Sequence, residues 1–159
     1  MSDVTLDMRA WNALQAALHG LGDKAVKVGI LGSKAEVADD EGFTLAERAA
    51  VHEYGTADGS VPERRWIRGT FATYEQELIA LQVKLAKAFF TGSLNANQAL
   101  GQLGVWAANK VKTHVKQDDL MPPLKPATIA AKGSDRPLID TGLMVNSVSY
   151  EVVKDSGDR

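Results

Sequence analysis

The residues with the clearest chemical meaning are Asp140, Thr141 and Gly142, which follow two apolar residues near the end of the chain. This pattern is the local signature of aspartic proteases, in which two such aspartates share a proton and activate water. Those enzymes place most of an all-β fold after the motif, whereas seventeen residues follow Gly142 here and the preceding sequence is largely helical in pattern. We therefore predict a structural role, in which Asp140 and Thr141 cap the next segment and Gly142 permits a tight turn.

Other patterns give little support to catalysis. The segment 29–34 lacks the spacing of either common phosphate-binding glycine loop. The three histidines, His19, His52 and His114, are far apart in sequence and the chain has no cysteine, so no metal-ligand spacing is present. We predict that the protein is not an enzyme and has no cofactor or metal. A small hydrolase with Asp140 or His52 in a cleft is the alternative.

A basic and aromatic cluster consists of Arg64, Arg65, Trp66 and Arg68. Guanidinium groups beside an indole can bind phosphate, stack on bases or bind acidic groups of a partner protein. Arginine and tryptophan are also enriched at interface hot spots. A second basic cluster lies on a separate predicted helix: Lys110, Lys112 and Lys116. We favour a protein interface, with a solvated surface or a nucleic-acid-binding module that uses both clusters as alternatives.

Two polar loops are further interface candidates. The first, residues 32–42, contains Glu36, Asp39, Asp40 and Glu41, against which only Lys34 is basic. The second comprises residues 56–60. Such an acidic segment repels DNA phosphates, so it suits either the wall of a DNA channel or a basic patch on a neighbouring protein. The alternative is that both loops simply face solvent.

Composition indicates one globular domain. The chain has 159 residues, of which 45% are hydrophobic and 24% charged. No apolar stretch approaches the roughly 20 residues of a membrane helix. Asp3 and Asp7 stand where a secretory signal would be basic and then apolar. We expect a soluble, cytoplasmic product.

The net charge of −2 conceals an asymmetry along the chain. Residues 1–62 carry ten acidic and five basic residues, whereas residues 63–159 carry ten acidic and thirteen basic ones. This division is compatible with head-to-tail contacts between copies, in which an acidic face meets a basic one. Two solvated faces of a monomer would also account for it.

The elements that must position these residues follow from hydrophobic periodicity. Apolar residues at helical spacing predict long helices over residues 6–21, 73–90 and 97–116. Thr44 and Glu47 predict a capping box for a further helix that ends at Gly55. A small-residue strip, Gly101, Gly104 and Ala108, would let another backbone approach closely. Strands are predicted at 25–31 and 149–153, and a short helix at 143–147.

These elements predict a single α+β domain over residues 1–159. Its small antiparallel or mixed sheet, with strands near both chain ends, packs on the N-terminal helix and the two long central helices. The loop 32–43 and the proline-rich connector 117–137 are predicted to be irregular. Residues 154–159 should fray.

Four segments together resemble one protein family: VKVGIL (26–31), AAVHEYGTADGSVPERRWIRGTF (49–71), PPLKPATIAAKGSDRPLIDTGLM (122–144) and NSVSYEVV (146–153). An alanine-rich helix that ends in E-[YF]-G-T, followed by a proline and an arginine-aromatic cluster, is similar to small neck proteins of long-tailed bacteriophages. So is the later order of L-x-x-x-T-x-x-x-K-G, P-L-[IV]-D-T-G and a final S-[IV]-x-[YF] strand. These are called tail-completion, head–tail joining or virion-morphogenesis proteins.

The resemblance implies a structural protein that forms a ring, with sixfold order, at the junction of capsid and tail. Its partners would be copies of itself, the head connector, and the tail-terminator or tail-tube protein. DNA would pass through the lumen without sequence-specific contact, and the protein would reside in the virion without any membrane association. The family often has a second proline and a phenylalanine in the arginine segment, where this chain has Glu63, Arg65 and Trp66.

Overall fold

The computed structural model describes residues 8–39, 42–117, 123, 125–126, 129–130 and 142–154. Four residues singled out from the sequence, Asp40, Glu41, Asp140 and Thr141, lie outside the described residues. Most of the connector 117–137 and the tail after Lys154 also lie outside them.

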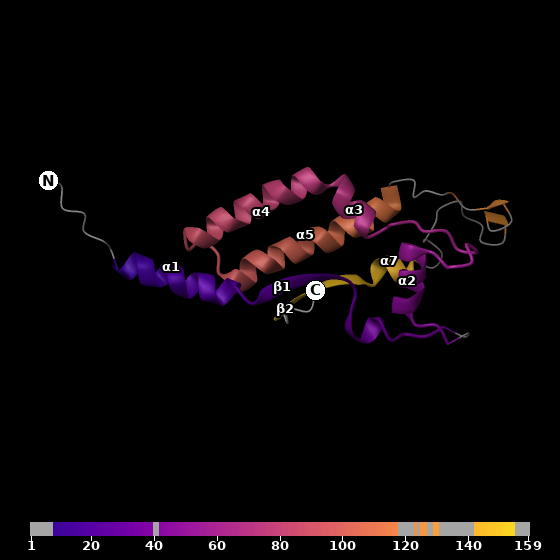
Figure 1. Ribbon diagram of the computed structural model, residues 1–159, viewed down its shortest axis with the longest axis horizontal. Coiled ribbons are helices and arrows are strands. Elements are labelled where there is room, and N and C mark those ends of the chain that lie inside the picture. Colours follow the sequence, from indigo (N-terminus) through magenta and orange to yellow (C-terminus); the bar gives the residue numbers. More distant parts are fainter. Residues whose placement is uncertain are drawn as a thin grey trace.

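The described chain is α+β, as the sequence predicts (Figure 1). Its elements in order are α1 (Met8–Leu21), β1 (Lys24–Ile30), the 3-10 turn η1 (Gly32–Lys34), α2 (Leu45–Tyr54), α3 (Arg68–Thr73), α4 (Glu75–Phe90), α5 (Ala96–Gln117), α7 (Leu143–Asn146) and β2 (Val148–Lys154). The predicted capping box of α2 is confirmed, because Thr44 Oγ1 accepts from the Glu47 amide and the Glu47 carboxylate accepts from the Thr44 amide. At Tyr74 the backbone leaves helical geometry and separates α3 from α4.

The sheet is one antiparallel pair, and it joins the two ends of the chain. β1 pairs with β2 from Lys24 opposite Lys154 to Ile30 opposite Val148. Because side chains alternate along a strand, Ile30 and Val148 share one face with Tyr150, and this face packs on α5. On the opposite face Lys27 and Glu151 are exposed and directly paired, an arrangement of opposite charges that stabilises an antiparallel register.

Helix α5 supports both the sheet and α4, and its glycines determine how closely β2 approaches (Figure 1). A Cβ atom on Gly104 would overlap the ring of Tyr150. A Cβ atom on Gly101 would lie 3.8 Å from Tyr150 Oη, which is ordinary van der Waals contact. The strip of small residues on α5 was predicted to let another backbone approach closely. In the structure, strand β2 of the same chain packs against it.

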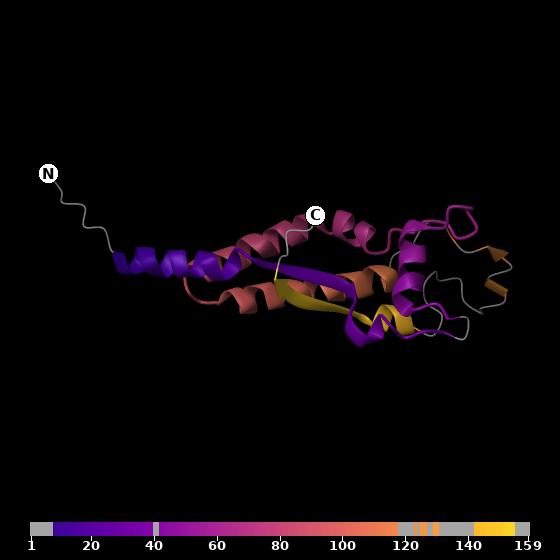
Figure 2. The same cartoon turned by 60° about the horizontal axis from the view of Figure 1, so that its bottom comes forward.

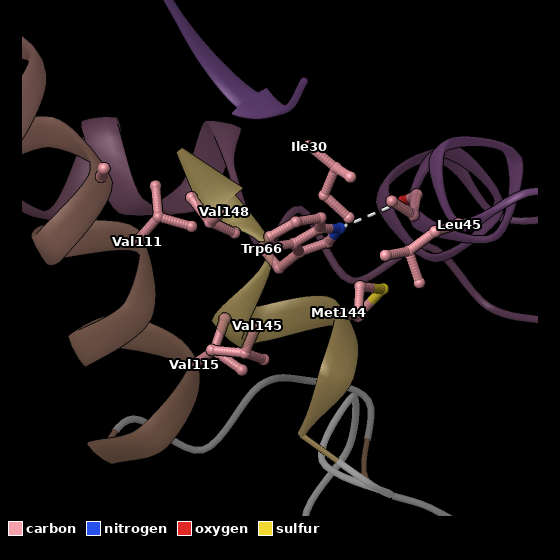
Figure 3. Packing of buried hydrophobic residues seen from close by; sticks show 10 residues of the cluster. Ile30, Leu45, Trp66, Val111, Val115, Met144, Val145 and Val148 are labelled. Atoms are coloured by element: carbon pink, nitrogen blue, oxygen red, sulfur yellow. Dashed lines mark hydrogen bonds between the residues drawn. The ribbon is translucent and has the colours of Figure 1, made fainter. Parts of the chain in front are cut away.

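The hydrophobic core lies where α5, α2, α7 and the two strands meet (Figure 3). Its fully buried side chains include Trp66, Val111, Val145 and Val148. Further buried residues from β1, α2, α5 and α7 complete the cluster: Ile30, Leu45, Ala49, Ala108, Val115 and Met144.

Helix α1 is placed differently from the sequence expectation. The strands pack on α5, whereas α1 extends beyond the body of the molecule along its long axis (Figures 1 and 2). Only the last turns of α1 lie beside the α4–α5 turn, where Ala16 and Gly20 face Phe89 across a shallow pocket. The physical reason is the short connection: two residues separate Leu21 from Lys24, so α1 must leave from the end of β1.

Gly104→Ala should destabilise the protein even though alanine is the better helix former, because the new methyl group must displace Tyr150. We expect a loss of about 1–3 kcal/mol in the free energy of unfolding, as for an overpacked core. Gly101→Ala, one turn away, should be neutral or stabilising by up to about 1 kcal/mol. Urea unfolding of both variants measures the difference. Equal stabilities would contradict the described packing of β2 on α5.

Candidate functional site

The arginine and tryptophan cluster predicted from the sequence lies where the end of α2 meets the start of α3. We call this region the arginine corner. It comprises Glu53, Tyr54, Gly55, Glu63, Arg64, Arg65, Trp66 and Arg68. Both acidic residues were missed by the sequence reasoning. The signal that was present is their position: Glu53 lies in the last turn of a capped helix, two residues before Gly55, and Glu63 directly precedes the arginines.

Glu53 is a buried carboxylate that caps a helix distant in sequence. Its side chain is 5% exposed. Its oxygens accept the backbone amides of Ile67 at 2.8 Å and Arg68 at 3.1 Å. These amides begin α3 and have no partner within that helix, so the carboxylate satisfies donors that would otherwise be unpaired. Glu53 therefore fixes where α3 starts relative to α2.

Arg68 joins both carboxylates of the corner. Its Nε donates to Glu53 Oε1 at 2.7 Å and its Nη2 donates to Glu63 Oε1 at 2.7 Å. The guanidinium also lies over the Tyr54 ring, 4.6 Å from the centroid, in a cation–π contact. The hydrogen bond to Glu53, with that to Glu63, raises the pKa of Arg68 above its ordinary value. Arg68 is thus committed to contacts within the chain.

Arg65 adopts a strained backbone conformation on the outside of the corner. Its φ of 39° lies in the left-handed region, which a long side chain rarely occupies. The Gly69 amide donates to the Arg65 carbonyl at 2.6 Å and holds this conformation. Its Nε donates to Glu63 at 2.8 Å, and this contact lowers the pKa of Glu63, with a smaller contribution from Arg68. The Arg65 side chain is 66% exposed and is the part of the cluster most accessible to a partner.

The strained turn at Arg65 directs its two neighbours inward. Trp66 is completely buried, and its Nε1 donates to the Ala49 carbonyl of α2 at 3.1 Å (Figure 3). Arg64 is also buried, and removal from water lowers the pKa of its guanidinium. In this conformation a partner cannot contact the indole. The cluster predicted as a continuous interface therefore divides into a buried, structural part and an exposed part at Arg65.

Gly55 is the position where the corner requires glycine. It ends α2 with a φ of 74°, as the predicted helix stop requires. A Cβ atom there would lie 2.8 Å from the Glu63 amide nitrogen and 3.0 Å from the Val61 carbonyl oxygen. The returning loop thus packs directly against the end of the helix. Gly142 has a similar φ of 73° and precedes α7, in agreement with the predicted tight turn.

The polar loop that begins at Thr56 is held by its own hydrogen bonds. The Thr56 amide donates to the Val61 carbonyl at 2.9 Å, and the Val61 amide donates to Thr56 Oγ1 at 3.0 Å. Asp58 accepts the Ser60 amide at 3.0 Å. The hydroxyl of Thr56, followed by the Ser60 amide, lowers the pKa of Asp58 to about 2. This loop therefore displays a fixed negative charge at its exposed tip.

The acidic loop is anchored to α2 in its described part. The Leu45 and Ala46 amides donate to the carbonyls of Val37 and Ala35. Asp39 accepts the Phe43 amide at 2.9 Å and pairs with Arg48, so it acts structurally. Glu36 is exposed. An open groove of about 700 Å³ lies between this loop and the Thr56 loop, and Asp39, Arg48 and His52 are among its lining residues.

The second basic cluster is also engaged within the chain. Lys110 pairs with Glu77 of α4 at 2.6 Å and lies over the Tyr74 ring at 4.2 Å. Lys112 is half-buried, and Lys116 is exposed near the end of α5. Because Lys110 and Arg68 have acidic partners, the two clusters offer fewer available cations to phosphate than the sequence suggests.

The described residues contain no group of three or more side chains arranged to bind a metal ion. His114 is buried and meets the Tyr74 ring edge-on, with centroids 6.2 Å apart. His52 lines the groove beside Arg48, and His19 is on α1. In the part of the chain that the structure describes, each helix is either too short or too polar to cross a lipid bilayer.

Glu53→Gln should weaken the arginine corner, because an amide cannot replace a charged acceptor for Arg68 and two backbone amides. We expect a loss of about 1–3 kcal/mol in the free energy of unfolding. Glu63→Gln, which removes the exposed acid bound to the same arginine, is the matched control and should have a much smaller effect. Thermal and urea unfolding report both variants. A larger loss for Glu63→Gln would contradict the assigned role of Glu53.

The Asp58 carboxyl should titrate near pH 2 rather than near its ordinary pKa of 3.8. Since its pKa is lowered in the folded state, the charged form stabilises the loop above about pH 4, and this contribution disappears as the pH falls toward 2. NMR titration of the carboxyl carbon measures it. Thr56→Val removes the hydroxyl and should raise the pKa toward 3.8. An ordinary pKa in the unsubstituted protein would contradict the loop geometry.

Comparison of the chain with known protein families, with characterised proteins and with solved structures finds no match. The role of the arginine corner must therefore be argued from its own geometry. What that geometry provides is a rigid junction that presents Arg65, the ionised Asp58 loop and an open groove on adjoining segments.

Proposed function

We propose that this chain is a structural virion protein of a tailed phage. In this proposal it forms an oligomeric ring at the neck, where it joins the tail to the head connector and lets DNA pass. Its partners are copies of itself, the connector protein, and the tail-terminator or tail-tube protein. The proposal assigns it no enzymatic activity.

One observation carries the proposal: the residues of segment 49–71 that resemble the phage family depend on one another physically. Glu53 caps the helix that Arg68 begins, and Gly55 leaves room for the returning loop. Trp66, which stands where the family often has another residue, adds a hydrogen bond to Ala49 at the start of the same segment. This interdependence supports the resemblance as one of structure.

The corner also supports a scaffold role over nucleic-acid binding. A phosphate that approached Arg68 would have to displace Glu63 and compete with the buried Glu53. Arg64 and Trp66 are buried in the same conformation. A protein that recognises nucleic acid requires a broad surface of available cations. A rigid, charge-compensated junction instead suits a subunit that must hold loops in fixed positions against neighbouring proteins.

The experiment is deletion of the gene from the phage that encodes this chain, followed by electron microscopy of the lysate. We expect DNA-filled heads and separate tails, with joined particles restored by a plasmid copy of the gene. In the restored particles a tagged chain should map to the head–tail joint, with rotational order and no isolated twofold dimer. Normal joined particles after deletion, or absence of the tagged chain from virions, would overturn the proposal.

A further inference from the structure

The two-stranded sheet has an outer edge on each side. β1 and β2 pair only with each other in the described structure. Among the described residues, the backbone of 24–30 and 148–154 makes no hydrogen bond outside this ladder. Each strand therefore presents a row of N–H and C=O groups with which a further strand could pair.

Neither edge has the backbone features that usually prevent a further strand from pairing. Natural edge strands are often very short, bulged or interrupted by proline. Here each strand has seven residues, the register is continuous, and neither strand contains proline. Charged side chains also protect an edge, because they repel a strand of like charge. The central residues of the two strands, Lys27 in β1 and Glu151 in β2, therefore determine which strands each edge excludes.

The two strands are accessible over the same part of the ladder. Gly29, Ile30 and Val148 are buried, whereas each residue of 24–28 and of 150–154 is partly or fully exposed. These two accessible stretches lie opposite each other in the ladder, and Figure 2 shows the strands side by side. A strand that joined either edge in the register of the chain's own ladder would therefore pair only with accessible residues.

Lys27 and Glu151 carry opposite charges that the chain itself does not use. Both side chains are exposed on the face of the sheet that is turned away from α5, and their Cα atoms are partners in the ladder. Neither side chain forms an ion pair or a hydrogen bond with another described residue. Both charges are therefore accessible to the sheet edge of a neighbouring molecule.

The positions of these charges distinguish between the ways in which two copies could pair their edges. Two β1 strands would bring together only lysines, because β1 contains two lysines and no acid. Two antiparallel β2 strands would set Glu151 opposite its own copy over their full length, or opposite Val153 over the accessible stretch. A β1 strand against β2 of a second copy, in the chain's own register, sets Lys27 opposite Glu151. Opposite charges stabilise such a cross-strand pair, and like charges destabilise it.

The same register also sets Lys24 opposite Lys154, as it does within the chain. Both lysines are at the end of the ladder, and each has an acceptor outside it. Lys24 Nζ donates to Asn97 Oδ1 at 2.9 Å, and Lys154 Nζ lies 3.7 Å from the Asp23 carboxylate. This pair of like charges therefore does not prevent the register.

We propose that the outer edge of β1 in one copy pairs with the outer edge of β2 in a second copy, antiparallel and in the register of the chain's own ladder. This inference deepens the proposed function and rests on it, since it identifies the contact that builds the ring. Each copy uses two different edges, so the contact is heterologous and propagates from copy to copy until a rotation closes it.

Cross-linking between two single-cysteine chains tests the pairing, because the chain has no cysteine of its own. Ala25 and Val153 are partners in the ladder and are partly exposed on the same face as Lys27. An Ala25→Cys chain and a Val153→Cys chain, one of them with a tag that changes its mass, are mixed at high concentration and treated with a short bismaleimide. The main product should be a covalent heterodimer, and either chain alone should give little dimer.

The control replaces the Val153→Cys chain with a Val105→Cys chain. Val105 of α5 is 47% exposed, more than Val153, but lies outside both edges. The heterodimer with Val153→Cys should be several-fold more abundant than that with Val105→Cys. Equal yields, no heterodimer, or a predominance of homodimers would each overturn the pairing. Circular dichroism checks that the variants fold alike.

Charge reversal in the two chains tests the register. Lys27→Glu, added to the Ala25→Cys chain, should lower the yield of heterodimer several-fold, because two glutamates then face each other between the copies. Glu151→Lys, added to the Val153→Cys chain, should restore the yield. Each chain keeps like charges opposite each other within its own ladder, so the restoration reports only the contact between copies. An unchanged yield, or a failure to restore it, would overturn the pairing.

The pairing and the proposed function can fail separately. A charge-dependent heterodimer, together with normal joined phage particles after deletion of the gene, would retain the pairing and reject the neck function. Unjoined heads and tails after the deletion, without a heterodimer, would reject the pairing alone.

Discussion

The buried carboxylate of Glu53 is the interaction on which the corner of the molecule depends. A carboxylate removed from water is costly unless every oxygen finds a donor. Here the donors are two amides at the start of α3 and the guanidinium of Arg68. The requirement to satisfy this one charge sets the position of α3 on α2. It thereby also sets the turn at Arg65 and the inward direction of Trp66.

The core follows from that placement. Once Trp66 points inward, its indole fills the space between α2 and the β1–α7 side of the molecule, and its N–H reaches the Ala49 carbonyl (Figure 3). On the other side, Gly104 lets the Tyr150 ring lie against α5. A two-stranded ribbon is marginal by itself, so this backing by a 22-residue helix is what makes the sheet stable. The charge network thus fixes α3 on α2, and the close helix–strand contact fixes β2 on α5.

Local rules in the sequence predicted the elements but not the side-chain roles at the corner. The Thr44–Glu47 capping box and the apolar periodicity of α4 and α5 involve residues three or four positions apart. These elements can therefore be predicted from the sequence alone. The direction of Trp66 depends on a φ of 39° at Arg65 and on an acid fourteen residues earlier than Ile67. Neither the backbone conformation of Arg65 nor the capping role of Glu53 can be predicted from the arginine-rich segment itself. By composition that segment is typical of an exposed surface. The position of α1 outside the body of the molecule could not be predicted either. An amphipathic pattern predicts a helix with an apolar side, but it does not identify the surface against which that side packs.

The two ends of the described structure differ in where the core and the charge network lie. The end that holds α2, α7 and Trp66 contains the buried core cluster and a compensated charge network, while Phe43, Tyr54 and Leu143 remain exposed there. The end that holds α1 and the C-terminal part of α4 leaves apolar side chains exposed, with Phe90 and Leu18 about half accessible (Figure 1). Exposed apolar side chains therefore occur at both ends, whereas the core cluster and the charge network that fixes α3 on α2 lie together at one of them.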